Sequence, residues 1–233
     1  MTLKLSVLIP VYNEESTIDD LLSAVLAVEL DKEVIVVDDC STDGTSAALK
    51  AWAGKVKVLR HPVNRGKGSA VRTALAAATG DTIVIQDADL EYDPNDYADL
   101  IAPIERGEAK VVYGVRALDE QTPLMRLGNQ LMTLATNVLY GTHLKDVETC
   151  YKMLAREVFE HLDLHSERFE LETELTAQIV RLGYEIYEVP ISYHPRYGKE
   201  KKLTPWDGLP TLWQLIKHRY RKYPLQANEE LEE

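Results

Sequence analysis

The chain has 233 residues, 45% of them hydrophobic and 27% charged, which is enough for one sizeable globular core. Its formal net charge of −12 argues against non-specific binding to nucleic acid, or to anionic membranes through the whole surface. The two cysteines lie far apart and the six histidines are scattered, so a zinc site is not expected and reduced thiols are.

The first half of the chain alternates short apolar runs with helical patterns. We predict strands at 5–10, 33–39, 55–60 and 82–85, and helices at about 16–27, 46–53 and 69–78 between them. This alternation is typical of βαβ units. It predicts an α/β fold in which a mainly parallel sheet is flanked by helices, with a nucleotide-binding half in the first ~115 residues.

The second half has a longer and less regular pattern. A helix near 95–105 and a strand at 110–116 are followed by helices at 124–140 and 170–182 and a strand at 184–189. A basic loop at 196–203 and a last helix at about 205–220 complete the pattern, and the acidic end beyond residue 223 is expected to be disordered. No run approaches the ~20 apolar residues that span a bilayer. The first residues also lack the hydrophobic stretch of a signal peptide, so we expect a cytoplasmic protein, attached to a membrane at most peripherally.

Three acids follow the strand at 82–85 at alternate positions: Asp87, Asp89 and Glu91. In an extended chain they would point the same way, at the carboxyl end of the strand, where open α/β sheets bind ligands. Crowded carboxylates repel one another unless a cation lies among them, and hard oxygen ligands suit Mg²⁺ or Mn²⁺. A solvated acidic turn is the alternative, which so short a motif leaves open.

Polar clusters also follow two other strands, at 10–14 and at 38–39. Because parallel strands end at one edge of the sheet, the three clusters should converge on a ligand crevice. Tyr12 could stack on a base, and the aspartates at 38–39 could bind a base or ribose. Arg65 and Lys67, in a glycine-containing segment at a helix amino end, could contact a diphosphate, unless they only form a surface turn.

Several other enzyme classes lose support from the absence of their motifs. The chain has no G-x-x-x-x-G-K-[ST] loop and no G-x-G-x-x-G after its first strand, which argues against ATPases and dinucleotide-dependent dehydrogenases. It has no G-x-S-x-G elbow and no H-E-x-x-H, which argues against nucleophilic hydrolases and zinc proteases.

Five segments together resemble the ordered signature of inverting family 2 glycosyltransferases with the GT-A fold. The branch that they resemble is the dolichyl- or polyprenyl-phosphate hexose (mannose or glucose) synthases. The segments are L-S-V-L-I-P-V-Y-N-E-E (5–15), V-V-D-D-C-S-T-D-G-T (36–45), N-R-G-K-G (64–68), Q-D-A-D-L-E (86–91) and V-Y-G-V-R (112–116).

The resemblance implies roles for single residues. In that family the D-x-D acids bind a divalent cation and the diphosphate of a nucleotide sugar, so the implied metal ligands here are Asp87, Asp89 and Glu91. The implied binding site for the nucleotide sugar consists of Pro10, Tyr12, Glu14, Asp38, Asp39, Lys67, Asp87, Ala88 and Asp89.

The carboxyl-terminal half resembles the same branch through F-E-x-E-x-E-L at 169–175, V-P-I-x-Y at 189–193 and the basic loop at 196–203. There are two departures. Cys150 replaces the glycine of the family's D-x-x-[ST]-G segment, which bears on the local backbone, and Lys201 stands where many members carry serine. We expect a single domain at 1–223, with a nucleotide-sugar-binding half (1–116), an acceptor-binding half (117–203) and an amphipathic helix (204–223), followed by an acidic tail (224–233).

The implied reaction transfers a hexose, with inversion, from GDP-mannose or UDP-glucose to a polyprenyl or dolichyl monophosphate. Asp89, Asp146, Arg116 and Arg196 are the candidate catalytic residues, and Arg116, Arg126, Lys201 and Lys202 are the candidates for binding the acceptor phosphate. Asp146 would orient the sugar or an arginine. For Arg116, Asp146 and Arg126 a structural salt bridge is the alternative, and for Glu170, Glu172 and Glu174 we expect mostly solvated or structural roles.

Two rival activities remain open on the residues alone. One is transfer to a hydroxyl of a small soluble or saccharide acceptor, which needs a base, with Asp146 as the first candidate. The other is sugar nucleotidyl transfer, although the chain has P-V-Y-N-E where a glycine-rich loop would stand. The helices at 124–140 and 209–220 could lie on a lipid surface, contact a membrane-protein partner, or pack into the core or a homodimer.

Overall fold

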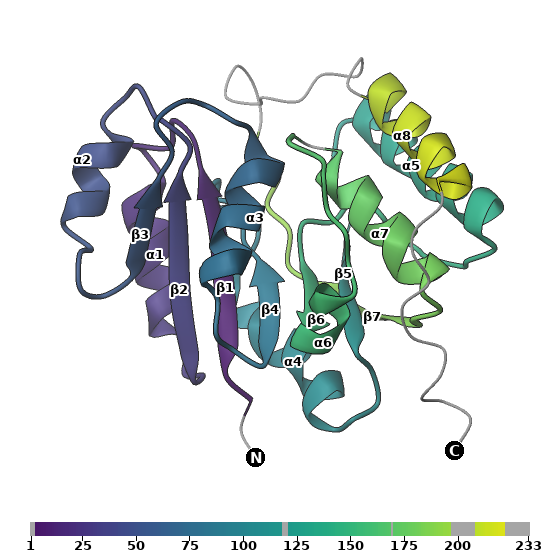
Figure 1. Cartoon of the computed structure of the whole chain (residues 1–233), viewed down its shortest axis with the longest axis horizontal. Helices are drawn as coiled ribbons and strands as arrows, with labels where there is room; N and C mark the ends of the chain where they lie inside the picture. The colour runs from purple at the N-terminus through teal and green to yellow at the C-terminus, as the bar shows by residue number, and fades with distance from the viewer. Residues whose placement is uncertain (1–2, 118–120, 169, 197–207, 222–233) are drawn as a thin grey trace.

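The computed structural model describes residues 3–117, 121–168, 170–196 and 208–221. Within them, seven strands form one sheet in the order β3-β2-β1-β4-β6-β5-β7 (Figure 1). All strand pairs are parallel except those of β6, which runs antiparallel to both β4 and β5. The strands are β1 (Leu5–Val11), β2 (Lys32–Asp38), β3 (Lys57–Arg60), β4 (Thr82–Ile85), β5 (Val111–Arg116), β6 (Lys152–Ala155) and β7 (Ile186–Ile191).

Helices cover both faces of this sheet. Figure 1 shows α1 behind the strands and α3 in front of them, as expected when successive right-handed crossovers run in opposite directions from β1. The helices are α1 (Ile18–Ala27), α2 (Thr45–Lys50), α3 (Lys67–Ala77), α4 (Tyr97–Glu105), α5 (Pro123–Tyr140), α6 (Arg156–Glu160), α7 (Leu171–Arg181) and α8 (Gly208–Tyr220), with a 3₁₀ turn at Pro94–Asp96.

The central strands are apolar because both of their faces are covered. Every residue of β1 and of β4 is buried, and the core contains almost only aliphatic and tyrosine side chains. This confirms the prediction of an α/β fold with a mainly parallel sheet flanked by helices. The division into two functional halves stays a prediction, and the basic loop beyond Arg196 and the acidic tail lie outside the described residues.

Two elements were not predicted from the sequence. β6 has only four residues, and Lys152 among them argues against a buried strand, yet Lys152 is completely buried. The short helix α6 follows β6 directly. The insertion of β6 between β4 and β5 separates the two parallel parts of the sheet.

Candidate active site at the carboxyl ends of the parallel strands

The acidic segment after β4 turns instead of continuing as a strand. β4 ends at Ile85, and Leu90 has a left-handed φ of 60°, so the expectation that the three acids alternate along an extended chain is wrong. The acids nevertheless stay close together. Burial and the negative charges of Asp87 and Glu91 raise the pKa of Asp89 to about 7, although Arg196 acts in the opposite direction.

Arg196 joins this segment to the end of β1. Its guanidinium donates to Glu14 over 3.2 and 3.3 Å and lies 3.4 Å from Asp89 Oδ2, while its backbone N–H donates to Glu91 Oε1 over 2.8 Å. Burial alone would lower the pKa of Arg196, but its hydrogen bonds to Glu14 and the charges of Asp89 and Glu91 raise it. Tyr193 donates to the other oxygen of Glu91 over 3.0 Å. The guanidinium of Arg196 therefore joins carboxylates from two parts of the chain, Glu14 after β1 and Asp89 after β4.

The loop after β1 is fixed by hydrogen bonds to the start of α2 and to the acidic segment. The Glu14 N–H donates to Thr45 Oγ1 over 2.8 Å, and the Thr17 hydroxyl donates to the carbonyl of Ala88 over 2.7 Å. Pro10 is buried at the end of β1, whereas Tyr12 is among the exposed apolar residues of the described chain. These contacts confirm that the polar clusters after β1 and β4 lie at one edge of the sheet.

Asp38 and Asp39 at the end of β2 are buried and accept hydrogen bonds from their own surroundings. Asp38 accepts from the Ser41 N–H over 2.8 Å and from the Ser46 hydroxyl, and lies 3.4 Å from Arg60 Nε. Burial alone would raise the pKa of Asp38, but these hydrogen bonds lower it.

Asp39 fixes the glycine-containing loop before α3. Its carboxylate accepts from the backbone N–H groups of Arg65 (2.9 Å) and Gly66 (2.7 Å), and its Oδ1 lies 2.6 Å from His61 Nδ1. Gly66 has a φ of 87°, and a Cβ atom there would lie 2.4 Å from the Glu167 carbonyl oxygen, so this position requires glycine. Asp39 thus holds the loop before α3 in place, and its role in nucleotide binding stays a prediction.

Lys67 belongs to a buried chain of charges that leads away from the acidic segment. Its Nζ lies 2.7 Å from Asp87 Oδ1 and 2.9 Å from Glu172 Oε1, and Lys152 Nζ lies 2.8 Å from Glu172 Oε2. Burial alone would lower the pKa of Lys67, but Asp87, Cys150 and Glu172 raise it well above its usual value. Lys67 therefore lies beside the acidic segment with its ammonium group bound to two carboxylates, and its role in binding a nucleotide sugar stays a prediction.

The glutamates of α7 are buried and structural. Glu172 binds Lys67 and Lys152, and Glu174 accepts from the backbone N–H groups of His165 and Ser166 over 3.0 and 2.7 Å. Their shared F-E-x-E-x-E-L pattern does not predict their burial. Of the two roles expected for these glutamates, the structural one is confirmed for Glu172 and Glu174 and the solvated one is wrong.

Arg116 and Asp146 form a buried bidentate pair. Arg116 Nε and Nη2 donate to the two carboxylate oxygens of Asp146 over 2.7 and 2.8 Å, and the guanidinium also lies 5.1 Å from the centre of the Tyr193 ring. Both side chains are less than a tenth exposed. Asp146 therefore orients an arginine, which was one of its two expected roles.

The remaining predicted residues fall in three different places. Arg126 lies on the exposed side of α5, and Lys201 and Lys202 lie outside the described residues. Cys150 is buried and its φ is not left-handed, so replacing glycine does not strain the backbone there. Its Sγ lies 4.0 Å from Lys67 Nζ, and burial, followed by the charge of Asp87, raises the pKa of the thiol.

Three residues that the sequence analysis did not assign to the site contact it. Tyr193 binds Glu91 and stacks on Arg116, while Lys152 and Glu172 extend the charge chain from Lys67. Tyr193 and Glu172 stand in motifs that were recognised, whereas Lys152 has no motif signal.

The carboxylates of Asp87, Asp89 and Glu91 are the chemical type of ligand that a divalent cation prefers, but in this structure they are not arranged around a common point. Among the described residues, no group of three or more His, Cys, Asp or Glu side chains is arranged to hold a metal ion. Asp87 binds Lys67 and Glu91 binds Tyr193, so the three-carboxylate site stays a prediction. Asp87 and Asp89 are hard oxygen donors whose crowding is visible in the raised pKa of Asp89, and they are the residues that would hold such a cation.

A family model described as glycosyl transferase family 2 matches residues 6–163, from β1 to beyond α6. The chain belongs to glycosyl transferase family 2. The matched region contains Glu14, Lys67, Asp89 and the Arg116–Asp146 pair, which confirms the family resemblance inferred from the ordered motifs. Three residues of the site lie beyond the end of the matched region: Glu172, Tyr193 and Arg196.

Several curated family members cover most of this chain. The low-salt glycan biosynthesis hexosyltransferase Agl6 of Haloferax volcanii is 32% identical over 213 residues, which are 88% of this chain and 51% of that protein. The dolichol-phosphate mannosyltransferase of Pyrococcus furiosus is 29% identical, over 94% of this chain and 63% of that protein. The chain therefore spans about half to two thirds of the length of these two relatives.

Solved structures agree with the fold. Glucosyl-3-phosphoglycerate synthase of Mycobacterium tuberculosis, in complex with Mn²⁺, uridine diphosphate and glucosyl-3-phosphoglycerate, superposes with a TM-score of 0.71 at 26% identity. The match covers 93% of this chain and 78% of that one. The GT-A fold expected from the sequence is thereby confirmed.

Proposed function

We propose that the protein transfers a hexose, with inversion, from GDP-mannose or UDP-glucose to a polyprenyl or dolichyl monophosphate. The observation that carries the proposal is the meeting of Glu14, Asp89 and Arg196 at the carboxyl ends of β1 and β4. Such a mixed-charge cluster suits a nucleotide diphosphate, which can replace the carboxylates as the partner of the arginine. Membership of the family and the names of the lipid-phosphate transferases among the relatives support the same function.

The donor side of the reaction needs stabilisation of a leaving diphosphate. A divalent cation held by Asp87 and Asp89 would neutralise part of the charge that develops on that diphosphate. Arg196 would donate charge-assisted hydrogen bonds to its oxygens. Lys67 keeps Asp87 in place through a 2.7 Å ion pair and so positions a metal-binding residue.

The acceptor side favours a phosphate over a hydroxyl group. A phosphate monoester is already anionic near neutral pH and needs no general base, whereas a hydroxyl does. Both oxygens of Asp146 accept hydrogen bonds from Arg116, which makes this aspartate a poor base. Asp146 instead holds the guanidinium of Arg116 in place, and Arg116 in turn would orient an anionic acceptor.

A transfer assay with the full chain tests this function directly. The chain is incubated in detergent with Mn²⁺ and either radiolabelled GDP-mannose or radiolabelled UDP-glucose, with undecaprenyl phosphate as acceptor, and label in the organic phase is counted. We expect label from one of the two donors. We expect Asp89→Asn to abolish it and the matched control Asp99→Asn, on the exposed side of α4, to retain it. If no organic-extractable label forms from either donor, the lipid-phosphate acceptor is excluded.

A soluble phosphorylated acceptor is the second candidate, favoured by the similarity to glucosyl-3-phosphoglycerate synthase. Transfer to a hydroxyl would require another base than Asp146. Glu148 follows in the same segment, and burial raises its pKa, although Lys152 and Arg116 act in the opposite direction. Transfer of label to phosphoglycerate, lost in Glu148→Gln and not in Asp99→Asn, would establish this reaction in place of the first.

A further inference from the structure

Helix α5 presents most of its leucines to the outside of the molecule and its threonines to the inside. Its exposed residues include an apolar row with spacings of three and four residues, and their side chains are between 52% and 75% exposed. The row consists of Leu124, Leu127, Leu131, Leu134 and Val138. The buried residues of the same helix are Thr133 and Thr136. A helix at the surface of a globular protein normally turns its apolar residues inward and its polar residues outward. An exposed apolar row of this kind therefore marks an interaction surface.

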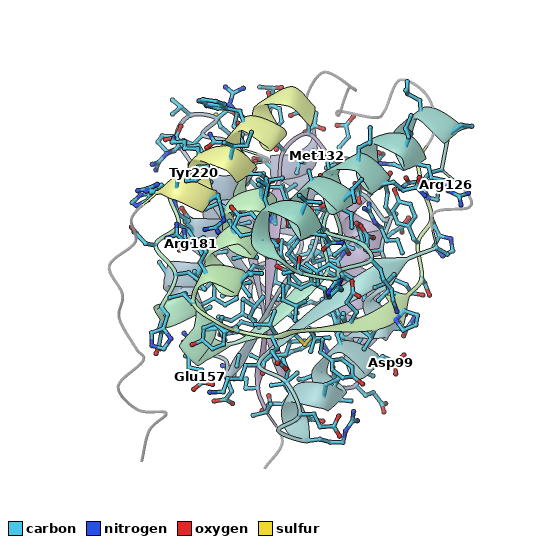
Figure 2. All side chains as sticks on the ribbon, turned by 90° about the vertical axis from the view of Figure 1, so that its right-hand side faces the viewer. Asp99, Arg126, Met132, Glu157, Arg181 and Tyr220 are labelled. Atoms are coloured by element: carbon cyan, nitrogen blue, oxygen red, sulfur yellow. The ribbon has the colours of Figure 1, made fainter. Side chains whose placement is uncertain are left out.

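Helix α8 extends this row into a wider surface. Trp213, Ile216 and Tyr220 are exposed, again at spacings of three and four residues, while Leu215 and His218 are buried. The two helices are joined by hydrogen bonds from Tyr140 Oη to the Leu215 carbonyl over 2.8 Å and from Arg219 Nε to the Leu139 carbonyl over 2.9 Å. Figure 2 shows α5, with Met132 and Arg126 labelled, beside α8, with Tyr220 labelled. We name the eight exposed apolar residues of the two helices the α5–α8 face.

The charge of this surface is opposite to that of the protein as a whole. The chain carries 38 Asp and Glu and a net charge of −12, yet the sequences of α5 and α8 contain no acidic residue. Their charged residues are Arg126, Lys217 and Arg219, and all three are exposed. An apolar surface with Trp and Tyr, basic residues and no carboxylate is the composition of helices that lie at a lipid interface.

The same charges argue against a second copy of the chain as the occupant. In a two-fold symmetric dimer the surface would meet itself, so Lys217 and Arg219 would approach their own copies with no acidic residue of α5 or α8 to pair with. An anionic bilayer surface complements both the apolar row and the basic residues. No helix in the described part of the chain is long and apolar enough to cross a membrane. A helix with an apolar row beside basic residues lies in the plane of the interface.

We propose that the α5–α8 face docks on the surface of an anionic lipid bilayer, with both helices lying in the interfacial plane. The purpose of docking rests on the proposed function, since a polyprenyl phosphate presents its phosphate at that surface. Figure 1 places α5 and α8 beyond the end of the sheet to which the carboxyl ends of β1 and β2 point. The two helices therefore lie at the same end of the molecule as the strand ends that carry the candidate site (Figure 1).

Vesicle flotation of the full chain tests the proposal. Vesicles of phosphatidylcholine alone are compared with vesicles that also contain phosphatidylglycerol, at low and at high salt. We expect flotation with the anionic vesicles, weakened by salt and much weaker on phosphatidylcholine alone. Leu131→Glu combined with Leu134→Glu should reduce the bound fraction by roughly tenfold or more. Lys217→Gln should weaken binding to anionic vesicles about fivefold without affecting phosphatidylcholine.

The matched control replaces two exposed apolar residues elsewhere on the sheet. Val58 on β3 and Tyr187 on β7 lie on the two edge strands, and Val58→Glu combined with Tyr187→Glu should float like the wild type. Circular dichroism spectra check that the variants fold. A wild type that does not float, or a Leu131/Leu134 variant that floats equally well, overturns the proposal. A wild-type dimer by light scattering that this variant dissociates, together with no flotation, would assign the face to a second copy and also overturn it.

The transfer assay in detergent separates this proposal from the proposed function. Flotation without any transfer would leave the docking surface standing and remove the activity. Transfer in detergent without flotation would leave the activity standing and remove the docking surface, because detergent supplies the lipid acceptor without a bilayer.

Discussion

The guanidinium of Arg116, at the end of β5, is held by the carboxylate of Asp146 through two parallel hydrogen bonds of 2.7 and 2.8 Å. Burial alone would lower the pKa of Arg116, but Tyr92 and Asp146 raise it well above its usual value, so the guanidinium stays charged. The attraction between two buried charges adds little to the free energy of unfolding, because both lose their hydration. Losing one of the two charges is costly, because the other then stays buried without a partner.

Replacing one partner of this ion pair should therefore destabilise the protein more than replacing both partners with apolar residues. Asp146→Asn is expected to lower the free energy of unfolding in urea by about 3–5 kcal/mol, because it leaves the Arg116 charge uncompensated in the interior. The double variant Arg116→Met, Asp146→Leu should lose less than Asp146→Asn alone. Glu108→Gln, which removes an exposed partner of Arg106, serves as control and should leave the unfolding midpoint unchanged. Equal losses in the single and double variants would contradict this account.

The charge chain from Lys67 through Glu172 to Lys152 gives a prediction on pH. Burial alone would raise the pKa of Glu172, but the ammonium groups of Lys152 and Lys67 lower it to about 2. A carboxyl whose pKa is lower in the folded state stabilises the fold above its ordinary pKa of 4.5, and this stability is lost as the pH falls towards 2. Glu172→Gln should thus cost about 3–5 kcal/mol at neutral pH, and the difference from the wild type should shrink steadily below about pH 4.

Urea unfolding of both proteins between about pH 7 and pH 3 measures this difference. Glu170→Gln, in the same motif but outside the charge chain, is the matched control and should show no such pH dependence. A difference that stays constant down to pH 3 would show that Glu172 is not held by the two lysines.

The sequence located the site because parallel strands impose where it lies. Glu14, Asp38, Asp39 and Asp89 follow β1, β2 and β4, and once the alternation of elements indicates a parallel sheet their common edge follows from topology. Arg196 was predicted only through the family resemblance, since nothing local places it 182 residues away against Glu14. Contacts of that range depend on how the second half of the sheet docks.

Other features could not be predicted because local patterns are ambiguous where polar groups are buried. Lys152 in β6 and Glu172 in α7 each look solvent-exposed in sequence. Their pairing over 2.8 Å, together with the ion pair between Lys67 and Glu172, offsets the cost of burying both charges. The acids after β4 look like an extended chain, but Leu90 takes a left-handed conformation and turns them. The apolar row of α5 looks like an ordinary core-facing stripe, and its exposure depends on which side of the helix packs against the protein.

The two cysteines should differ strongly in reactivity. Cys150 is buried, and its surroundings raise the pKa of its thiol, whereas Cys40 is half-buried in the loop after β2. With a chromogenic disulfide reagent at about pH 8, the native protein should react rapidly at one thiol and the second should react only on unfolding. Cys40→Ser should remove the fast phase and Cys150→Ser should not. Two fast thiols in the native protein would place Cys150 at the surface, contrary to the structure.

The acidic segment after β4 predicts opposite effects of one substitution with and without a divalent cation. Asp89 is only a fifth exposed, and its pKa of about 7 lies above the unfolded value of 3.8, so the folded state binds more protons there. Without metal, the free energy of unfolding should therefore fall as the pH rises from about 4 to about 7, and Asp89→Asn should remove this decline. At about pH 8 the variant is then expected to be more stable than the wild type, by an amount on the order of a few kcal/mol.

Mn²⁺ should raise the melting temperature of the wild type, more at pH 8 than at pH 6 because protons compete for the carboxylate, and should do so much less for Asp89→Asn. Thermal unfolding of both proteins, with and without Mn²⁺ at the two pH values and with Asp99→Asn as control, measures each effect. A variant that is less stable than the wild type at pH 8 without metal would show that Asp89 is not under electrostatic strain, because the crowding of Asp87, Asp89 and Glu91 requires the opposite sign.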